Sequence, residues 1–472
     1  MNGPTGLVLS ESGPSRPLSP DIAARLSIEV DTELMSTPGT LEREVVRKLS
    51  LRIVPVLFLG AFVGFLDRVN VAFAALTMND SLGLTPRVFG WAAGFFFIGY
   101  LLFEIPGTVC LARFGSRRSM AAFMIAWGAL SISMAFLSTP TSLIIVRFLT
   151  GAAEAGFFPG TILYMSLWVP ATHRARIGGY FMLAIPLASV IGAPVSALIL
   201  RHMHEVAGLE GWQWLFILEG LPAVAVSIAV LRLIDDTPSR AAWLTGPQRD
   251  WLMQTLAAEA QPSAAPVRPP TGLLGLLNRK MALLCFVQFA CPAVAYGVTL
   301  WLPQVVRSFG TSIVETGLIS ALPFITGALA MWWWPAHSDR TGERKWHLTL
   351  APLVSSLGLG LSVATSSPLL KLCCLLVASL GMFSFLPIAW AVSHSLFGRS
   401  AAPVGYAVVS MSGALAGFVS PYVMGVLRER TGNFELGILV LAGTGLAAAW
   451  AANRLFARQP FESASSSATI EG

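Results

Sequence analysis

The sequence contains Ala112-Arg113-Phe114-Gly115-Ser116-Arg117-Arg118 and, 227 residues further on, Asp339-Arg340-Thr341-Gly342-Glu343-Arg344-Lys345. An arginine, a glycine and two further cations recur at matching places, and each stretch separates two apolar segments. The glycine permits a tight turn, and cations around such a turn can reach helix ends and acidic groups of a neighbouring helix. Either stretch alone also fits the ordinary basic charge of a membrane loop. The match between them indicates one structural unit that is present twice.

The composition places most of the chain in a membrane. Hydrophobic residues make up 54% of the 472 residues and charged residues 12%, whereas soluble domains have about 45–50% and about 25%. None of the four lysines follows the glycine of a phosphate-binding loop, and the five cysteines show no metal-ligand spacing. The net charge is +6, and the basic residues lie between apolar segments. This arrangement does not form a nucleic-acid-binding face. We therefore expect the lipid bilayer as a partner, and no cofactor, metal or nucleic acid.

Apolar segments of membrane-spanning length recur along the whole chain. A hydrocarbon core of about 30 Å requires about 20 helical residues. The predicted spans are 51–76, 88–111, 119–137, 142–166, 177–200, 214–234, 281–303, 315–336, 347–366, 371–391, 402–427 and 436–454. The sequence thus predicts an all-α membrane protein with twelve transmembrane helices.

The distribution of lysine and arginine predicts the orientation of these spans. The loops and ends on one side carry 21 such residues, and those on the other side carry 6. Because basic loops stay on the cytoplasmic side, both termini are predicted to be cytoplasmic. The expected location is the inner membrane of a bacterium.

The longest internal loop divides the predicted helices into two six-helix bundles. We expect a disordered cytoplasmic tail over 1–50, bundles over 51–234 and 280–457, a cytoplasmic linker over 235–279, and a C-terminal tail over 458–472. The first 40 residues are rich in proline and serine, which is typical of disorder, and Met35 is an alternative start to Met1. Within the linker, a helical pattern around 239–260 precedes a proline-rich segment.

Four further stretches carry a resemblance to a known family. They read Phe65-Leu66-Asp67-Arg68-Val69-Asn70; Glu104-Ile105-Pro106; Arg147-Phe148-Leu149-Thr150-Gly151-Ala152-Ala153-Glu154-Ala155-Gly156-Phe157-Phe158-Pro159-Gly160; and Gly211-Trp212-Gln213-Trp214-Leu215-Phe216 with Glu219-Gly220-Leu221-Pro222. With the two repeated loops, they resemble the major facilitator superfamily and, within it, the anion:cation symporter group. The resemblance implies two bundles that transport an organic anion together with a cation, usually H⁺.

Away from the ends of the predicted spans, acidic and basic residues occur in the first six spans, whereas the last six contain none there. They are Asp67, Arg68, Glu104, Arg147, Glu154 and Glu219. A charge at bilayer depth costs about 2.5–3.5 kcal/mol on insertion scales, so each one requires a partner or a function. At 1.5 Å per residue, Asp67 lies about 21 Å and Glu154 about 18 Å from the inner ends of their helices. We expect both carboxyls at one depth, with Arg147 two turns further out.

The resemblance implies roles for several of these residues. Asp67 and Glu154 match the proton-coupling pair of the family, and Arg68 matches the arginine that contacts the substrate carboxylate. We expect Arg147 to pair with one of the two acids, while static ion pairs between the first and fourth spans are the alternative. The other candidate substrate-binding residues are polar or aromatic: Asn70, Tyr100, Tyr296, Trp301, Trp390 and Ser410.

The two repeated loops are predicted to form a gate on the cytoplasmic side. Glu104 lies about 10 Å from the inner end of its span, so we assign it to this gate rather than to the substrate, and we take Glu219 as a helix contact. The other predicted gate residues are Arg113, Gly115, Arg117, Arg118, Asp339, Arg340, Gly342 and Arg344.

Departures from the family pattern bear on the substrate. Ser410 and Ala414 stand where the resemblance leads us to expect asparagines, and Ala389 stands in place of an expected phenylalanine. The loss of two amides removes partners for substrate hydroxyls. The sequence therefore favours a less hydroxylated or aromatic carboxylate over a sugar acid.

These observations predict a monomeric secondary transporter that imports an organic carboxylate with H⁺ by alternating access. Na⁺ as the coupling ion, and an exporter, exchanger or uniporter of a related solute, are the alternatives. A membrane-embedded enzyme is disfavoured, because we find no nucleophile with an adjacent base, no metal cluster and no cofactor loop. A transporter-derived sensor would differ in that no substrate moves.

Overall fold

The computed structural model describes residues 38–260, 279–396 and 402–456, and these residues form helices, short 3₁₀ turns and loops with no β-strand. Helices predominate because a backbone in lipid must satisfy its own hydrogen bonds. Eleven helical segments are long and apolar enough to cross a membrane. The remaining span, α5, has 19 residues and begins with Ser116, Arg117 and Arg118. The twelve-helix fold predicted from the sequence is confirmed.

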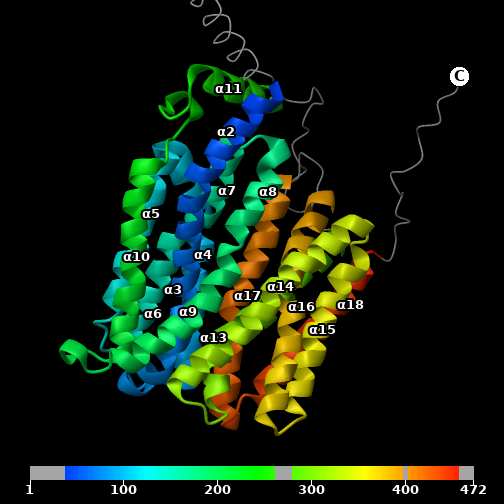
Figure 1. The fold of residues 1–472 in the computed structure, drawn as a ribbon. Coiled ribbons are helices and arrows are strands. Elements are labelled where there is room, and N and C mark those ends of the chain that lie inside the picture. The colour runs from blue at the N-terminus through cyan, green and yellow to red at the C-terminus, as the bar shows by residue number, and fades with distance from the viewer. Residues whose placement is uncertain (1–37, 261–278, 397–401, 457–472) are drawn as a thin grey trace, which may run out of the picture.

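The spans follow the predicted order in two sets of six. The first set is α3 (Val54–Ser81), α4 (Pro86–Phe114), α5 (Ser116–Met134), α6 with α7 (Pro140–Glu154, Phe157–Trp168), α8 with α9 (Ala171–Met182, Ala184–His202) and α10 (Gly211–Leu233). The second set is α13 (Arg279–Arg307), α14 (Ile313–Thr341), α15 (Lys345–Val363), α16 (Pro368–Leu396), α17 (Ala402–Thr431) and α18 (Glu435–Leu455). Figure 1 shows the two sets as neighbouring bundles.

Proline explains why two spans consist of two helices each. The break between α6 and α7 lies at Ala155 and Gly156, just before Pro159, and the break between α8 and α9 lies at Leu183, just before Pro186. A proline ring cannot donate to the carbonyl four residues earlier and clashes with it. These two spans are interrupted one turn before a proline, whereas α4 and α9 continue through Pro106 and Pro194.

The segment before the first span is helical, so the predicted disordered tail over 1–50 is wrong for residues 38–50. Helix α2 (Pro38–Arg52) buries Val45 and Leu49 against the linker. Lys48 Nζ donates to Gln248 Oε1 over 2.7 Å. This apolar stripe with spacing i, i+4 is what a helix that packs on one face requires. Residues 1–37 lie outside the described part of the chain.

The linker also contains a helix in its first part. Helix α11 (Gly246–Ala260) lies beside α2 at one end of the molecule, which we call the α11 end (Figure 1). Trp243, just before it, stacks on Trp168 at 5.9 Å between ring centroids. The proline-rich segment 261–278 and the tail 458–472 lie outside the described residues.

The two bundles pack tightly at the end opposite α11. There the first half of α4 contacts the second half of α17, and a Cβ on Gly90 would lie 2.4 Å from the carbonyl oxygen of Pro421. Thr85 Oγ1, at the start of α4, donates to Glu429 Oε2 over 2.7 Å. Small residues at such a contact permit close helix approach. The bundles are thus closed against each other at the end opposite α11.

Candidate functional site

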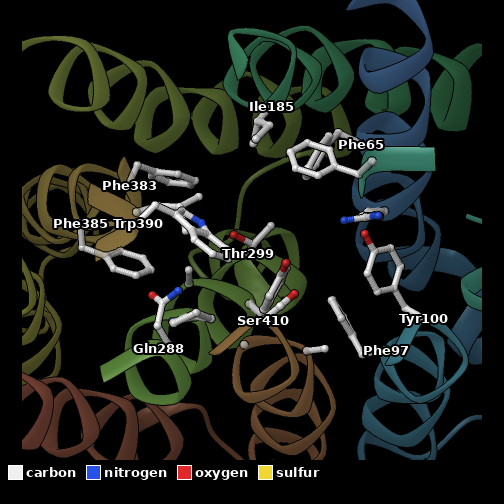
Figure 2. Close-up of a pocket in the computed structure, with 18 of the residues that line it drawn as sticks. Phe65, Phe97, Tyr100, Ile185, Gln288, Thr299, Phe383, Phe385, Trp390 and Ser410 are labelled. Carbon is white, nitrogen blue, oxygen red and sulfur yellow. The ribbon is translucent and has the colours of Figure 1, made fainter. Parts of the chain in front are cut away.

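A cavity of about 440 Å³ lies between the two bundles. Its wall combines residues of α3, α4, α6, α7 and α9 with residues of α13, α14, α16 and α17. Figure 2 shows Phe65 and Tyr100 of the first bundle on one side of the cavity, and Gln288, Phe385 and Trp390 of the second on the other. The volume falls within the range of small-molecule sites, about 300–1,000 Å³.

Arg68 of α3 lies at the cavity wall and is fixed by rings and by one carboxylate. Its guanidinium carbon is 4.7 Å from the ring centroid of Phe65 and 5.0 Å from that of Tyr100. Its Nε donates to Glu154 Oε2 over 3.0 Å. Glu154 Oε1 is buried and has no hydrogen-bond partner among the described residues. The guanidinium therefore reaches the cavity and a buried carboxylate at the same time.

A second pair of opposite charges lies behind the first. Arg147 Nη1 is 3.9 Å from Asp67 Oδ2, and both side chains are about 1–2% exposed. The other oxygen of Asp67 accepts hydrogen bonds from Ser131 Oγ and from Asn70 Nδ2, the latter over 3.3 Å. The predicted pairing of Arg147 with one of the two acids is present, and the acid is Asp67.

The two arginines share the ring of Phe96. The guanidinium carbon of Arg147 is 4.6 Å from its centroid, and that of Arg68 is 5.2 Å away. Helices α4 and α6 pack so closely here that a Cβ on Gly151 would lie 1.9 Å from the carbonyl oxygen of Phe96. The glycine thus allows α6 to bring Arg147 beside the ring, and cation–π attraction stabilises both cations.

Glu219 of α10 is a third buried carboxyl in the first bundle. It accepts a hydrogen bond from Ser196 Oγ of α9 over 2.8 Å. It is 2% exposed and does not line the cavity. The predicted helix contact of Glu219 is therefore present, between α9 and α10.

Glu104 does not lie where the sequence suggested. Its carboxylate lines the cavity and accepts a hydrogen bond from Ser410 Oγ of α17 over 3.0 Å. Among the described residues, no lysine, arginine or histidine nitrogen lies within 4.0 Å of it. The predicted contacts of Glu104 with the gate cations are therefore wrong. The prediction used distance along the helix axis, which does not reveal which way the side chain points.

The second bundle supplies polar and aromatic side chains to the cavity. Tyr296 of α13 contacts Phe97 of α4, with ring centroids 4.4 Å apart. Trp390 of α16 faces Tyr406 of α17 at 6.2 Å. Of the candidate substrate-binding residues predicted from the sequence, the cavity is lined by Arg68, Tyr100, Arg147, Tyr296, Trp390 and Ser410.

Two predicted substrate-binding residues lie elsewhere. Trp301 is fully buried, and its Nε1 donates to the carbonyl oxygen of Pro421 over 3.2 Å, where the bundles meet. Asn70 is buried and donates to Asp67 instead of reaching the cavity. Both predictions are corrected: Trp301 joins α13 to α17, and Asn70 orients the buried acid.

Sequence reasoning missed much of the aromatic wall. Phe65, Phe97, Phe158, Phe383 and Phe385 line the cavity. Phenylalanine is ordinary in an apolar span and carries no polar group, so the sequence offers no signal that separates these rings from lipid-facing ones. The stacking of Phe65 on Arg68, three residues later on the same helix face, is the one relation that spacing could have indicated.

The repeated loops form their turns, and within the described residues no ion pair joins one loop to the other. Gly115 and Gly342 have φ of +88° and +67°, which favours glycine. Asp236 Oδ1 accepts from the backbone N–H of Arg117 over 2.9 Å, and Arg344 Nη2 lies 2.6 Å from Asp339 Oδ1 in the second loop. The first loop is thus tied to the start of the linker and the second is tied within itself, and the gate stays a prediction. The remaining predicted gate cations, Arg113, Arg118 and Arg340, are exposed.

Metal-binding groups do not cluster in the described ranges 38–260, 279–396 and 402–456. No set of three or more histidine, cysteine, aspartate or glutamate side chains is placed to hold an ion there. The five cysteines are unpaired. The polar and aromatic groups that line the cavity are those of arginine, carboxylate, amide, hydroxyl, indole and phenyl side chains.

Two bundles of six helices around a central cavity with buried ion pairs define a membrane transport protein. The chain belongs to the Major Facilitator Superfamily, whose model matches residues 57–421. It is a multi-pass transporter and not an enzyme, as the sequence predicted.

The individual proteins to which the chain is similar are consistent with membership of this family. A "Putative tartrate transporter" of Agrobacterium vitis is 42% identical over 403 residues, which are 85% of this chain and 89% of that protein. A "Quinolone resistance transporter" of Acinetobacter baumannii is 33% identical over 85% of this chain and 92% of that protein. The solved structure of a D-xylose-proton symporter is similar in fold, with a TM-score of 0.71 over 87% of this chain and 98% of its own, at 16% identity.

Proposed function

We propose that this protein imports an organic carboxylate together with H⁺ by alternating access. The observation that carries the proposal is the position of Arg68, which lies at the cavity wall and pairs with the buried Glu154. An arginine fork is the side chain best suited to bind a carboxylate through two parallel hydrogen bonds. The same guanidinium can therefore serve either the ligand or Glu154.

This sharing couples the anion to the proton. When a ligand carboxylate takes the donors of Arg68, Glu154 loses its counter-charge while it stays buried. A buried carboxylate without a partner is stabilised by taking up a proton. Anion binding and proton uptake then favour each other. Asp67, held near Arg147 by Asn70 and Ser131, is the second acid that we assign to this coupling.

The relative named as a tartrate transporter supports an organic acid as the ligand. The cavity suits a small acid, because its volume is about 440 Å³ and several aromatic rings form its wall. We further propose that the protein acts as a monomer in a bacterial inner membrane with both termini in the cytoplasm. In that orientation the α11 end faces the cytoplasm, and the bundles in this structure are closed on the periplasmic side.

Proteoliposomes provide the test of the coupling. We expect an inward proton gradient to accelerate uptake of labelled tartrate and to drive its accumulation, whereas a Na⁺ gradient alone does not. Glu154→Gln should abolish gradient-driven accumulation but retain exchange of labelled for unlabelled ligand, because the substituted residue cannot release a proton. The matched control is Glu205→Gln, at an exposed loop carboxylate outside the cavity. Equal uptake with and without the proton gradient would overturn H⁺ coupling.

An exporter is the second candidate, and one observation favours it. The relative named for quinolone resistance is similar to this chain over most of its length, and quinolones are aromatic carboxylic acids that would suit the aromatic wall. Everted membrane vesicles separate the two directions. Energised accumulation of a fluorescent quinolone in everted vesicles supports export, whereas tartrate uptake confined to right-side-out vesicles supports import.

A further inference from the structure

Glu104 is a carboxylate that faces the ligand space and that the proposed coupling mechanism does not use. Its side chain lines the cavity, and one oxygen, Oε1, is held by Ser410. The described residues place no cationic nitrogen within 4.0 Å of it. The remaining acceptor capacity of the carboxylate is therefore available to whatever enters the cavity.

The position of Glu104 relative to Arg68 is set by helix α4. Tyr100 and Glu104 are four residues apart, so they are neighbours on one helix face, with Cβ atoms about 5–6 Å apart. The guanidinium of Arg68 lies over the ring of Tyr100. A ligand that binds Arg68 through its carboxylate therefore extends along this face toward Glu104. The two groups are fixed on different helices, and Ser410 limits the movement of Glu104 from the other bundle.

We propose that Glu104 determines specificity by accepting a hydrogen bond from a hydroxyl group of the ligand whose carboxylate binds Arg68. This inference rests on the proposed function and specifies the ligand as a hydroxylated carboxylic acid. A site built to bond a substrate hydroxyl discriminates strongly against the analogue without it, since the polar group of the site is then left unpaired. In addition, the negative charge of Glu104 repels a second carboxylate of the ligand. A ligand without a hydroxyl group has no hydrogen bond to Glu104 that offsets this repulsion.

This inference differs from the preference drawn from the sequence, which stays a competing prediction. The loss of the expected amides, with Ser410 and Ala414 in their place on α17, favoured a less hydroxylated ligand. In the structure Ser410 donates to Glu104, so a charged acceptor lies beside the position where an amide was expected. A carboxylate accepts from hydroxyls more strongly than a neutral amide does.

Three acids of equal chain length and equal charge provide the test. Tartrate, malate and succinate carry two, one and no hydroxyl groups, and their affinities can be measured with the purified full-length protein by calorimetry in detergent. We expect affinity to fall from tartrate to malate to succinate, by at least about tenfold between the first and the last. Glu104→Gln should reduce the tartrate-to-succinate ratio several-fold, because it weakens the acceptor and removes the repulsion.

Two further variants separate specificity from a structural role. Glu104→Asp keeps the charge but withdraws the carboxylate, and it should lower tartrate affinity while succinate stays weak. Ser410→Ala breaks the contact between the bundles but leaves the acceptor, so the ranking of the three acids should persist. If Glu104 serves only as a contact between bundles, then Glu104→Gln and Ser410→Ala will change all three affinities by the same factor.

The possible outcomes distinguish the two proposals. An unchanged tartrate-to-succinate ratio in Glu104→Gln, with measurable binding of both acids, overturns the role of Glu104 and leaves carboxylate transport intact. A wild-type protein that binds none of the three acids but binds another carboxylate overturns this inference alone. A wild-type protein that binds only solutes without a carboxylate overturns the proposed substrate class, and this inference fails with it. A ratio that collapses in Glu104→Gln and persists in Ser410→Ala supports it.

Discussion

The two bundles share one fold but contribute different chemistry to the cavity between them. The first bundle supplies Arg68, Glu104 and Arg147, whereas the described lining residues of the second carry no charge. Buried charges are costly in a membrane, and each one must be matched by a partner. Concentrating them in one bundle allows the arginines and acids of α3 and α6 to neutralise one another. The comparison teaches that duplication of a fold does not duplicate its chemistry: one bundle carries the charges of the cavity wall, and the other contributes uncharged polar, aromatic and apolar side chains.

The largest expected effect tests whether the buried charges of the first bundle hold each other in place. Arg147→Met should lower the free energy of unfolding by about 3–5 kcal/mol, because it leaves Asp67 buried without its cation. The measurement is denaturant or thermal unfolding of the purified protein in detergent. The double variant Arg147→Met with Asp67→Asn should recover part of the loss, since it removes both charges. A single variant that is as stable as the double variant would contradict the pairing.

The next effect concerns ligand binding by the same bundle. Arg68→Ala should weaken binding of the organic acid by about 30- to 150-fold, which corresponds to the loss of about 2–3 kcal/mol from hydrogen bonds to a charged group. Arg68→Lys should give an intermediate loss, because an ammonium keeps the charge but not the planar fork. Calorimetric titration measures both.

The control for this prediction is an arginine outside the cavity. Arg113 is exposed and lies over the ring of Phe114 at 5.5 Å, so Arg113→Ala should leave the dissociation constant unchanged. Equal losses in Arg68→Ala and Arg113→Ala would show that the effect reflects overall positive charge, and would contradict a specific carboxylate contact at Arg68.

The sequence predicts the fold well because the membrane leaves the chain few choices. Twelve apolar segments must be helices, and their number and order follow directly. The buried ions are also visible in sequence, since Arg147 and Glu154 have no ordinary place inside a span. Their pairing was only partly predictable: Arg147 lies near Asp67, and Glu154 pairs with Arg68. Which acid meets which arginine depends on how α3 and α6 are rotated about their axes.

Helix rotation also explains the residues that the sequence misplaced. Tyr296 and Trp301 lie five residues apart on α13, which puts them on different faces at about 100° per residue. The sequence cannot decide which face meets the cavity, because both faces of this helix are buried, one against α17 and one toward the ligand space. Glu104 was misplaced for the same reason. The depth of a residue along α4 follows from its place in the sequence, but the direction of its side chain depends on how α4 packs against α17.

The smallest effects test the second bundle, where two tryptophans have different surroundings. Trp390→Ala should weaken ligand binding by about tenfold through lost apolar contact. The ratio of protons to substrate should stay unchanged, because Trp390 lies in the cavity wall away from both ion pairs.

Trp301→Phe should leave the dissociation constant unchanged and lower the free energy of unfolding by about 1 kcal/mol. The substitution removes only the hydrogen bond to Pro421 and keeps a ring beside Phe89. Calorimetry, unfolding and coupled-flux measurements on the two variants separate these outcomes. A changed proton ratio in Trp390→Ala would show that the second bundle also takes part in coupling, and the division of chemistry between the bundles would then be wrong.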